Sequence, residues 1–123
     1  MPAAADIRAT VDRYLDALTT GSPAGIAALY ADDATVEDPA GSPAHRGRAA
    51  IEAFYGPLES GKTSAELLAV RITGNSAAIY FRVVTIAGDQ SFTIEPIDIM
   101  TFDERAQITS MRAYWSAEDM VQG

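Results

Sequence analysis

One carboxylate in the sequence, that of Asp98, lies in a segment where apolar side chains recur at every second position. The residues that alternation places on its face are Phe92, Ile94, Pro96, Met100 and Phe102. A carboxyl group in such surroundings loses its hydration, which raises its pKa and favours the neutral acid. Because a neutral carboxylic acid can donate a hydrogen bond, Asp98 is a candidate donor to a ligand oxygen.

A structural role is the alternative for Asp98. A lone aspartate in a strand commonly faces water or satisfies a nearby turn. Pro96 also favours a bulge or an edge position at this point, and a shift of one residue would turn Asp98 outward. The pattern alone leaves both interpretations open.

Asp38 is the second carboxylate of interest. It closes a short run of strand-forming residues and precedes Pro39. Proline disfavours the α region for the preceding residue, so Asp38 is expected in an extended turn. A base at the end of a strand could reach a ligand there, but Asp-Pro is also common in ordinary turns.

Three tyrosines fall on the apolar sides of predicted helices, namely Tyr14, Tyr30 and Tyr55. A tyrosine ring can pack in a core while its hydroxyl seeks a buried partner, so these hydroxyls could form a chain. Separate packing in the core is the alternative. Two predicted strands offer further inward faces, which could line a cavity or a plain core: Ile79, Phe81, Val83 and Thr85 on one, Met111, Ala113 and Trp115 on the other.

Other kinds of site find little support. His45 is the only histidine and cysteine is absent, which disfavours histidine triads, multi-histidine metal sites, thiolate nucleophiles and disulfides. The glycine-rich motif GxGxxG does not occur. The letters GPLESGKT at 56–63 match GxxxxGK[ST], but they lie between a predicted helix and a predicted strand, the reverse of the strand–loop–helix order of a phosphate-binding loop.

The elements that must position these residues follow from hydrophobic periodicity. Helical spacing predicts an amphipathic helix over 5–20, a short helix capped by Ser22 and started by Pro23, and a third helix over 48–55. Alternation predicts strands near 34–38, 64–73, 76–87, 90–102 and 107–115, with a loop over 40–47. Helices followed by consecutive strands are typical of an α+β fold, here a curved sheet over three helices around an apolar cavity.

Length and charge narrow the class of protein. The 123 residues are enough for one domain, 1–123. Nine basic and 17 acidic residues give a net charge of −8, which disfavours nucleic acid and anionic membranes as partners. We find no apolar run long enough to span a membrane and no pattern of a secretory signal. The cytoplasm is the expected location.

Four segments resemble bacterial Δ5-3-ketosteroid isomerases of the NTF2-like superfamily. They are YADDATVEDP at 30–39, GRAAIEAFY at 47–55, IDIMTFDE at 97–104 and MRAYWS at 111–116. The similarity extends from about residue 7 to 118. It implies the NTF2-like cone, a steroid substrate, no cofactor and no metal, and a homodimer formed through the sheets.

The resemblance also implies roles for individual residues. Asp38 matches the general base that carries a proton from C4 to C6, and Tyr14 and Asp98 match the oxyanion-hole donors to the C3 oxygen. Tyr30 and Tyr55 match tyrosines that support Tyr14 by hydrogen bonds. The residues expected to contact the steroid are Leu18, Phe54, Phe81, Val83, Met100, Met111, Ala113 and Trp115.

The sequence departs from the family pattern at two positions, and two alternative functions stay open. Pro96 and the hydroxyl of Thr85 leave the pocket shape and the preferred steroid undetermined. The chain could instead be another NTF2-like enzyme, a polyketide cyclase or a dehydratase, although a dehydratase would be expected to use histidine and only His45 is present. It could also be a non-catalytic module that binds an apolar ligand.

Overall fold

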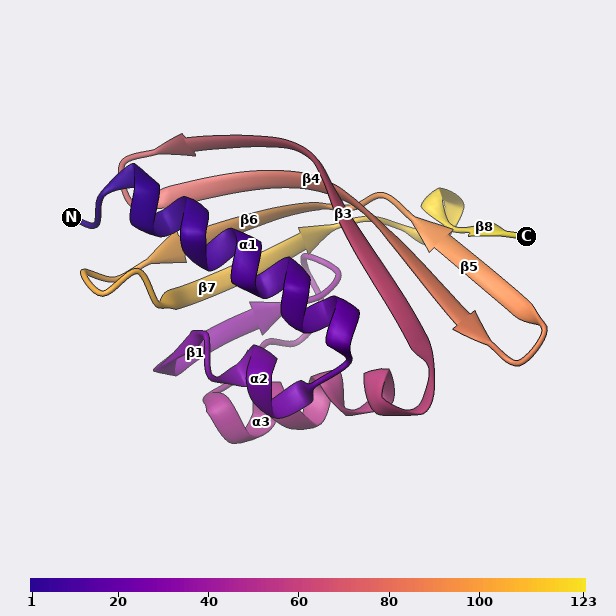
Figure 1. The fold of residues 1–123 in the computed structure, drawn as a ribbon. Coiled ribbons are helices and arrows are strands. Elements are labelled where there is room, and N and C mark those ends of the chain that lie inside the picture. The colour runs from indigo at the N-terminus through magenta and orange to yellow at the C-terminus, as the bar shows by residue number, and fades with distance from the viewer.

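The first helix, α1 (Ala4–Thr20), lies across one face of a curved sheet in the computed structural model, which describes residues 1–123 (Figure 1). Its buried residues recur every three or four positions and form one apolar stripe: Ile7, Thr10, Val11, Tyr14, Leu15 and Leu18. The helix ends at Gly21, whose φ of 70° lies in the left-handed region that glycine adopts readily.

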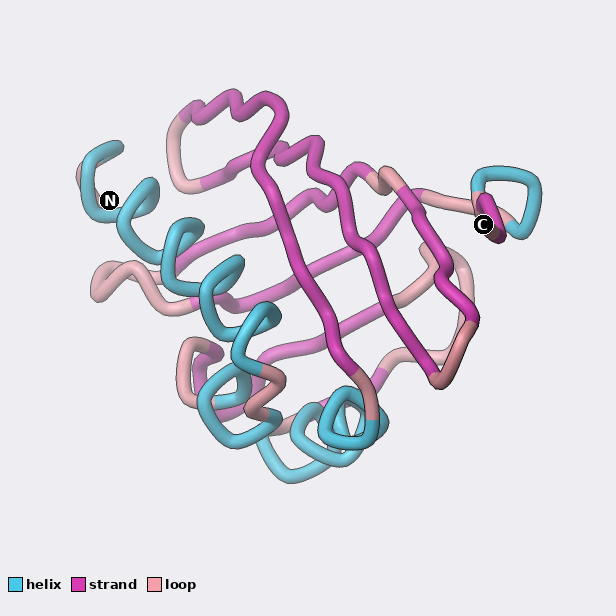
Figure 2. Tube along the Cα trace, turned by 45° about the vertical axis from the view of Figure 1, so that its right-hand side comes forward, coloured by secondary structure: helices cyan, strands magenta, loops and turns pink.

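Two shorter helices, α2 (Pro23–Ala27) and α3 (Arg48–Tyr55), pack together at one end of the sheet (Figure 2). The Ser22 side chain accepts a hydrogen bond from the backbone N–H of Gly25, which caps α2 as its sequence predicts. A 3₁₀ helix, η1 (Gly56–Ser60), continues directly from α3. The sequence predicted an end at Gly56 but not this extra turn.

The strands form a single mixed sheet. They are β1 (Tyr30–Glu37), β2 (His45–Arg46), β3 (Lys62–Thr73), β4 (Ser76–Ala87), β5 (Gln90–Ile94), β6 (Ile97–Phe102), β7 (Ile108–Tyr114) and β8 (Val121–Gln122). Their order is β2-β1-β7-β6-β4-β5-β8, and β3 pairs with β4. Only the pairing of β1 with β7 is parallel. Three helices on a curved sheet confirm the predicted α+β cone.

The strand predicted over 90–102 is wrong in one respect, because it is divided into β5 and β6 at Glu95 and Pro96. The first half of β4 pairs with β6 and its second half pairs with β5, so the chain must cross between two positions in the sheet. Proline lacks the N–H that a continuous ladder would need. The alternation survives the break, since Asp98, Met100 and Phe102 are all buried.

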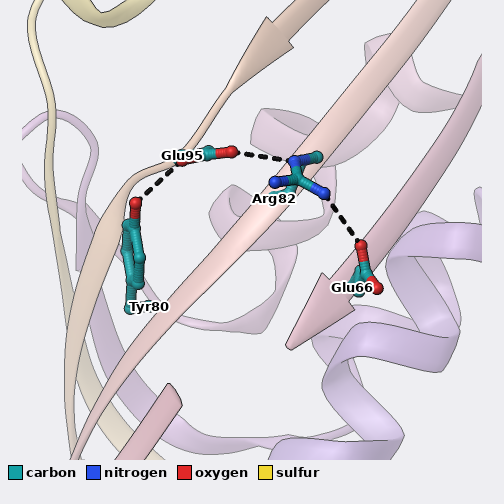
Figure 3. A network of polar contacts seen from close by, with 4 residues as sticks. All are labelled: Glu66, Tyr80, Arg82 and Glu95. Carbon is teal, nitrogen blue, oxygen red and sulfur yellow. Dashed lines mark hydrogen bonds and ion pairs between the residues drawn. The ribbon is translucent and has the colours of Figure 1, made fainter. Parts of the chain in front are cut away.

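Side chains on the outer face of the sheet hold this break in place (Figure 3). Glu95 accepts hydrogen bonds from the Tyr80 hydroxyl and from Arg82 Nε, both at 2.8 Å. Arg82 also pairs with Glu66 on β3 at 3.1 Å. The network therefore ties the connection between β5 and β6 to the two long strands β3 and β4.

Three further elements differ from the sequence prediction. The strand β1 begins at Tyr30 rather than Ala34, because Tyr30 pairs with Ile108 of β7, beyond a register shift. The loop predicted over 40–47 contains β2, which pairs with β1. The short strand β8 pairs with β5. Each depends on a partner distant in sequence, which local periodicity does not reveal.

None of the helices is both long and apolar enough to cross a membrane.

A buried hydrogen bond joins α1 to the turn between β6 and β7. Thr10 Oγ1 donates to the carbonyl oxygen of Ala106 at 2.7 Å. Ala106 has a φ of 58°, a left-handed conformation that costs a non-glycine residue about 1–2 kcal/mol. The bond thus holds the turn that leads from the strand of Asp98 into β7.

Thr10→Val should lower the free energy of unfolding by about 1–3 kcal/mol, because the buried carbonyl of Ala106 loses its partner while the side-chain shape is kept. Urea denaturation measures the change. Thr20→Val is the matched control, since the Thr20 hydroxyl is exposed and bonds within its own helix; a change within about 0.5 kcal/mol is expected there. Equal effects of the two substitutions would contradict the role of the bond.

Candidate active site

The concave face of the sheet and the helices enclose a cavity of about 250 Å³. Eleven of its sixteen lining residues are hydrophobic. The lining residues are Tyr14, Leu18, Asp38, Phe54, Tyr55, Pro57, Leu58, Thr63, Phe81, Val83, Ile94, Pro96, Asp98, Ala113, Trp115 and Met120. The two carboxylates and Tyr14, which the sequence singled out separately, thus meet at one apolar cavity.

Asp98 projects from β6 into this cavity and is only 2% exposed. Its Oδ1 atom is buried and has no hydrogen-bond partner in the protein. Burial raises the pKa of the Asp98 carboxyl well above its usual range, and the charge of Asp38 raises it further. This shift favours the neutral acid, whose proton would be available to an acceptor in the cavity.

The three tyrosine hydroxyls form the predicted chain. Tyr55 lies in the middle, 2.9 Å from the Tyr14 hydroxyl and 2.9 Å from the Tyr30 hydroxyl. Burial raises the pKa of each hydroxyl well above its usual value, so all three stay protonated. Tyr14 comes from α1, Tyr30 from the start of β1 and Tyr55 from the last turn of α3, so the chain links three elements.

Asp38 follows the last residue of β1 and is partly buried. Trp115 Nε1 donates a hydrogen bond to its Oδ1 atom at 2.5 Å. Burial raises the pKa of the Asp38 carboxyl, while the Trp115 bond and the nearby His45 partly oppose this rise. Asp38 is therefore less desolvated than Asp98, and its surroundings raise its pKa less than those of Asp98 do.

His45 does not join the tyrosines and carboxylates in the cavity wall. Its ring lies 4.6 Å from that of Phe54, between ring centroids, and its strand pairs with β1 beside Asp38. It therefore supports the cavity wall from outside. The structure contains no group of three or more His, Cys, Asp or Glu side chains that could hold a metal ion.

Six of the eight predicted contact residues line the cavity: Leu18, Phe54, Phe81, Val83, Ala113 and Trp115. Met100 and Met111 do not. They are paired across β6 and β7 and are 0% and 1% exposed in the core, because the position beyond Asp98 faces packed side chains rather than the cavity.

Several lining residues were not predicted: Pro57, Leu58, Thr63, Ile94, Pro96 and Met120. Pro57 and Leu58 belong to η1, and Met120 follows a second 3₁₀ helix, η2 (Ala117–Asp119). Neither element has a clear periodic signal. Ile94 and Pro96 were placed on the face of Asp98 but not assigned to the cavity. The alternation of β3 could have indicated Thr63, which shares a face with Ala65 and Leu67.

Comparison with known proteins identifies the family. The model of the SnoaL-like domain matches residues 11–111. A steroid Delta-isomerase from Nocardioides simplex is 62% identical over 117 residues, which cover 95% of each chain. The chain belongs to the SnoaL-like, steroid Δ-isomerase family. The family predicted from the four sequence segments is thus confirmed.

Solved structures of the same fold extend beyond steroid isomerases. SalBIII, described as an epoxide hydrolase/cyclase-like enzyme with a role in pyran ring formation in the polyether salinomycin, superposes with a TM-score of 0.89 at 22% identity over 98% of each chain. RV0760c from Mycobacterium tuberculosis superposes with a TM-score of 0.90 at 18% identity over the whole of each chain. At such identities the likeness establishes the NTF2-like fold alone.

The protonation of Asp98 should be visible in the stability of this family member. Its pKa is raised in the folded state, so above the unfolded-state pKa of about 4 the native protein retains a proton that the unfolded chain releases. Wild-type stability should therefore fall by about 1.4 kcal/mol per pH unit from this group alone, until Asp98 ionises.

Asp98→Asn should remove that contribution, and its stability relative to wild type should increase between pH 5 and pH 8. Urea unfolding across this range measures the difference. Asp33→Asn, at an exposed position, should leave the slope unchanged. A constant difference between Asp98→Asn and wild type would show that Asp98 is already ionised at pH 5.

Proposed function

We propose that this protein converts 3-oxo-Δ5-steroids into 3-oxo-Δ4-steroids. The observation that carries the proposal is the meeting of a neutral Asp98, the Tyr14 hydroxyl and the Asp38 carboxylate at one apolar cavity. The identity to a steroid Delta-isomerase, 62% over nearly the whole chain, supports the same reaction. An apolar cavity of about 250 Å³ suits a compact, largely hydrocarbon ligand.

In the proposed reaction Asp38 removes a proton from C4 of the steroid. The electron pair of the C4–H bond forms a C3–C4 double bond, and the carbonyl π electrons move to the C3 oxygen, which gives a dienolate. The C3 carbonyl then re-forms, and the electrons of the C3–C4 double bond form a new double bond between C4 and C5. The electrons of the C5–C6 double bond take the proton from Asp38 and become the new C6–H bond. Atoms and electrons balance without a cofactor.

The role of Tyr14 and Asp98 is to donate hydrogen bonds to the C3 oxygen as negative charge arrives there. Donors that are already in place stabilise this charge without reorganising solvent, and each is worth on the order of 10²–10³ in rate. If Tyr30 donates to Tyr55 and Tyr55 to Tyr14, the Tyr14 proton is left for the ligand. A chain of this kind polarises its last donor.

Asp38 suits the part of the base. Burial raises its pKa, which makes it a stronger base, while Trp115 and His45 oppose the rise and favour the charged carboxylate. A position at the end of β1, outside the regular ladder, leaves room for the carboxyl to serve both C4 and C6. Asp98 cannot take this part while it holds its own proton.

The decisive experiment follows the enone absorbance formed from 5-androstene-3,17-dione. Asp38→Asn should lower kcat by about 10²–10⁴-fold or more, because it removes the base. Asp98→Asn should cost less than the about 10²–10³-fold of a lost donor, because an amide can still donate. Equal and negligible effects would refute these roles. Turnover of a hydroxylated aromatic precursor, without steroid activity, would indicate a cyclase instead.

We propose further that the outer face of the sheet binds a second copy of the chain. Large apolar side chains are exposed there: Tyr80 by 38%, Ile97 by 44%, Ile99 by 36% and Tyr114 by 47%. The strand register places Tyr80, Ile97 and Tyr114 in one row across β4, β6 and β7. A continuous apolar row on the exposed face of the sheet favours a symmetric contact between identical surfaces.

Sedimentation tests this dimer. The wild type should sediment at twice the chain mass of 13.0 kDa, and Ile97→Glu should sediment as a monomer, because two like charges would meet at the contact. Val121→Glu is the control, since Val121 is exposed by 62% on β8, which pairs with β5 at the edge of the sheet and not with the strands of this row. A monomeric wild type would refute the dimer.

A single 1–123 isomerase domain that acts in the cytoplasm stays a prediction from the sequence.

A further inference from the structure

Two buried side-chain atoms in the whole chain lack a hydrogen-bond partner, Oγ1 of Thr63 and Oδ1 of Asp98. Both residues line the same cavity. The other buried hydroxyls, those of Thr10 and of the tyrosine chain, are all satisfied within the protein. An unpaired buried polar group is uncommon and destabilising, so a shared location at a ligand cavity points to a shared explanation.

The two unpaired groups lie toward opposite ends of the site. In the sheet Asp98 pairs with Ile79 of β4, whereas Thr63 of β3 pairs with Thr85 of β4. Six residues separate these positions, which corresponds to about 20 Å along a strand. Because the sheet is concave on this side, the inward side chains are closer together than the backbone path between them.

Apolar side chains fill the stretch between the two ends. Phe81 and Val83 of β4 alternate inward there and line the cavity. A rigid hydrocarbon skeleton with its ketone at Asp98 would lie along these side chains and point its far end toward Thr63. At that end the neighbouring wall is also apolar, formed by Leu58 and Met120 among others. The Thr63 hydroxyl is therefore an isolated polar group in apolar surroundings.

The charge of the cavity restricts what Thr63 could bind. The two aspartates, Asp38 and Asp98, are the only acidic residues that line it, and no lysine or arginine does. An anionic substituent would thus be repelled and would lack a counter-ion. A hydroxyl group can donate to a ketone and can either donate to or accept from an alcohol. A neutral oxygen substituent is the best match.

We propose that Thr63 is a specificity-determining residue that hydrogen-bonds a ketone or hydroxyl oxygen on the steroid ring farthest from the 3-ketone. The inference rests on the proposed function and assigns a residue to the end of the ligand opposite the 3-ketone. Thr85, opposite Thr63 in the sheet, does not line the cavity.

The test compares 5-androstene-3,17-dione with 5-androsten-3-one, which lacks the far oxygen. Thr63→Val keeps the side-chain shape and should raise KM for the dione by about 3–10-fold, the value of one neutral hydrogen bond, with kcat nearly unchanged. The same substitution should leave the kinetics of 5-androsten-3-one unchanged. Thr63→Ser, which retains the hydroxyl, should behave as wild type toward both steroids.

Thermal unfolding separates this role from a structural one. Thr63→Val should keep or raise the Tm of the ligand-free protein, because it removes an unsatisfied buried hydroxyl. A lower Tm, together with equal losses for both steroids, would show that Thr63 serves the fold and would overturn the inference. Unchanged kinetics for both steroids would also overturn it.

Equilibrium binding keeps the inference testable if the proposed reaction fails. The dissociation constants of 4-androstene-3,17-dione and 4-androsten-3-one can be measured for wild type and Thr63→Val without any turnover. A loss of affinity confined to the dione supports the role of Thr63 even in a protein that does not isomerise steroids. Equal affinities in both proteins refute it, whatever the activity.

Discussion

Desolvation of one carboxyl group is the constraint on which the site depends. Asp98 stands on the concave face of the sheet, 2% exposed, with an oxygen that no protein group satisfies. The same burial that would make a charged aspartate very costly makes the neutral acid a good donor, because no water competes for its proton. The rest of the fold is arranged to keep that position dry: α1 covers it, the tyrosine chain closes one side, and the break at Pro96 still leaves Asp98 facing inward.

Such a site lowers the stability of the fold that carries it. Unsatisfied oxygens at Asp98 and Thr63 each reduce the free energy of unfolding, and a well-packed core must offset them. That core is a continuous cluster of 21 buried residues, whose deeper part includes Met100 and Met111. These two methionines show why a face that is apolar throughout is ambiguous in sequence. One part of this apolar face packs as core and the neighbouring part lines a cavity. The curvature of the sheet makes the difference.

The sequence was most informative where a polar residue interrupted an apolar period. Alternation placed Asp98 on the inward face unless a bulge at Pro96 shifted it, and helical spacing placed Tyr14 on the apolar stripe of α1; burial confirms both positions. It was least informative where pairing is non-local. The parallel contact of β1 with β7 and the exchange of β4 between two partners arise from tertiary packing, so local patterns predicted one long strand where there are two. Thr63 escaped notice because the strand was predicted to begin at residue 64, whereas β3 begins at Lys62, and because its unpaired hydroxyl is visible only in the structure.

The charge of the site explains why two acids can work in one cavity without a cation. In the proposed reaction Asp38 begins with one negative charge and Asp98 begins neutral. When Asp38 takes the proton, the charge moves through the steroid to the C3 oxygen, beside Asp98 and Tyr14, and the total does not change. The negative charge of Asp38 helps to keep Asp98 protonated at the start, and that influence disappears as the oxyanion forms. The cavity therefore holds one negative charge at every stage, first on Asp38 and then on the C3 oxygen. Hydrogen-bond donors placed at the C3 oxygen can take the place of a lysine or arginine there. A cation would stabilise the charged base as strongly as it stabilised the oxyanion.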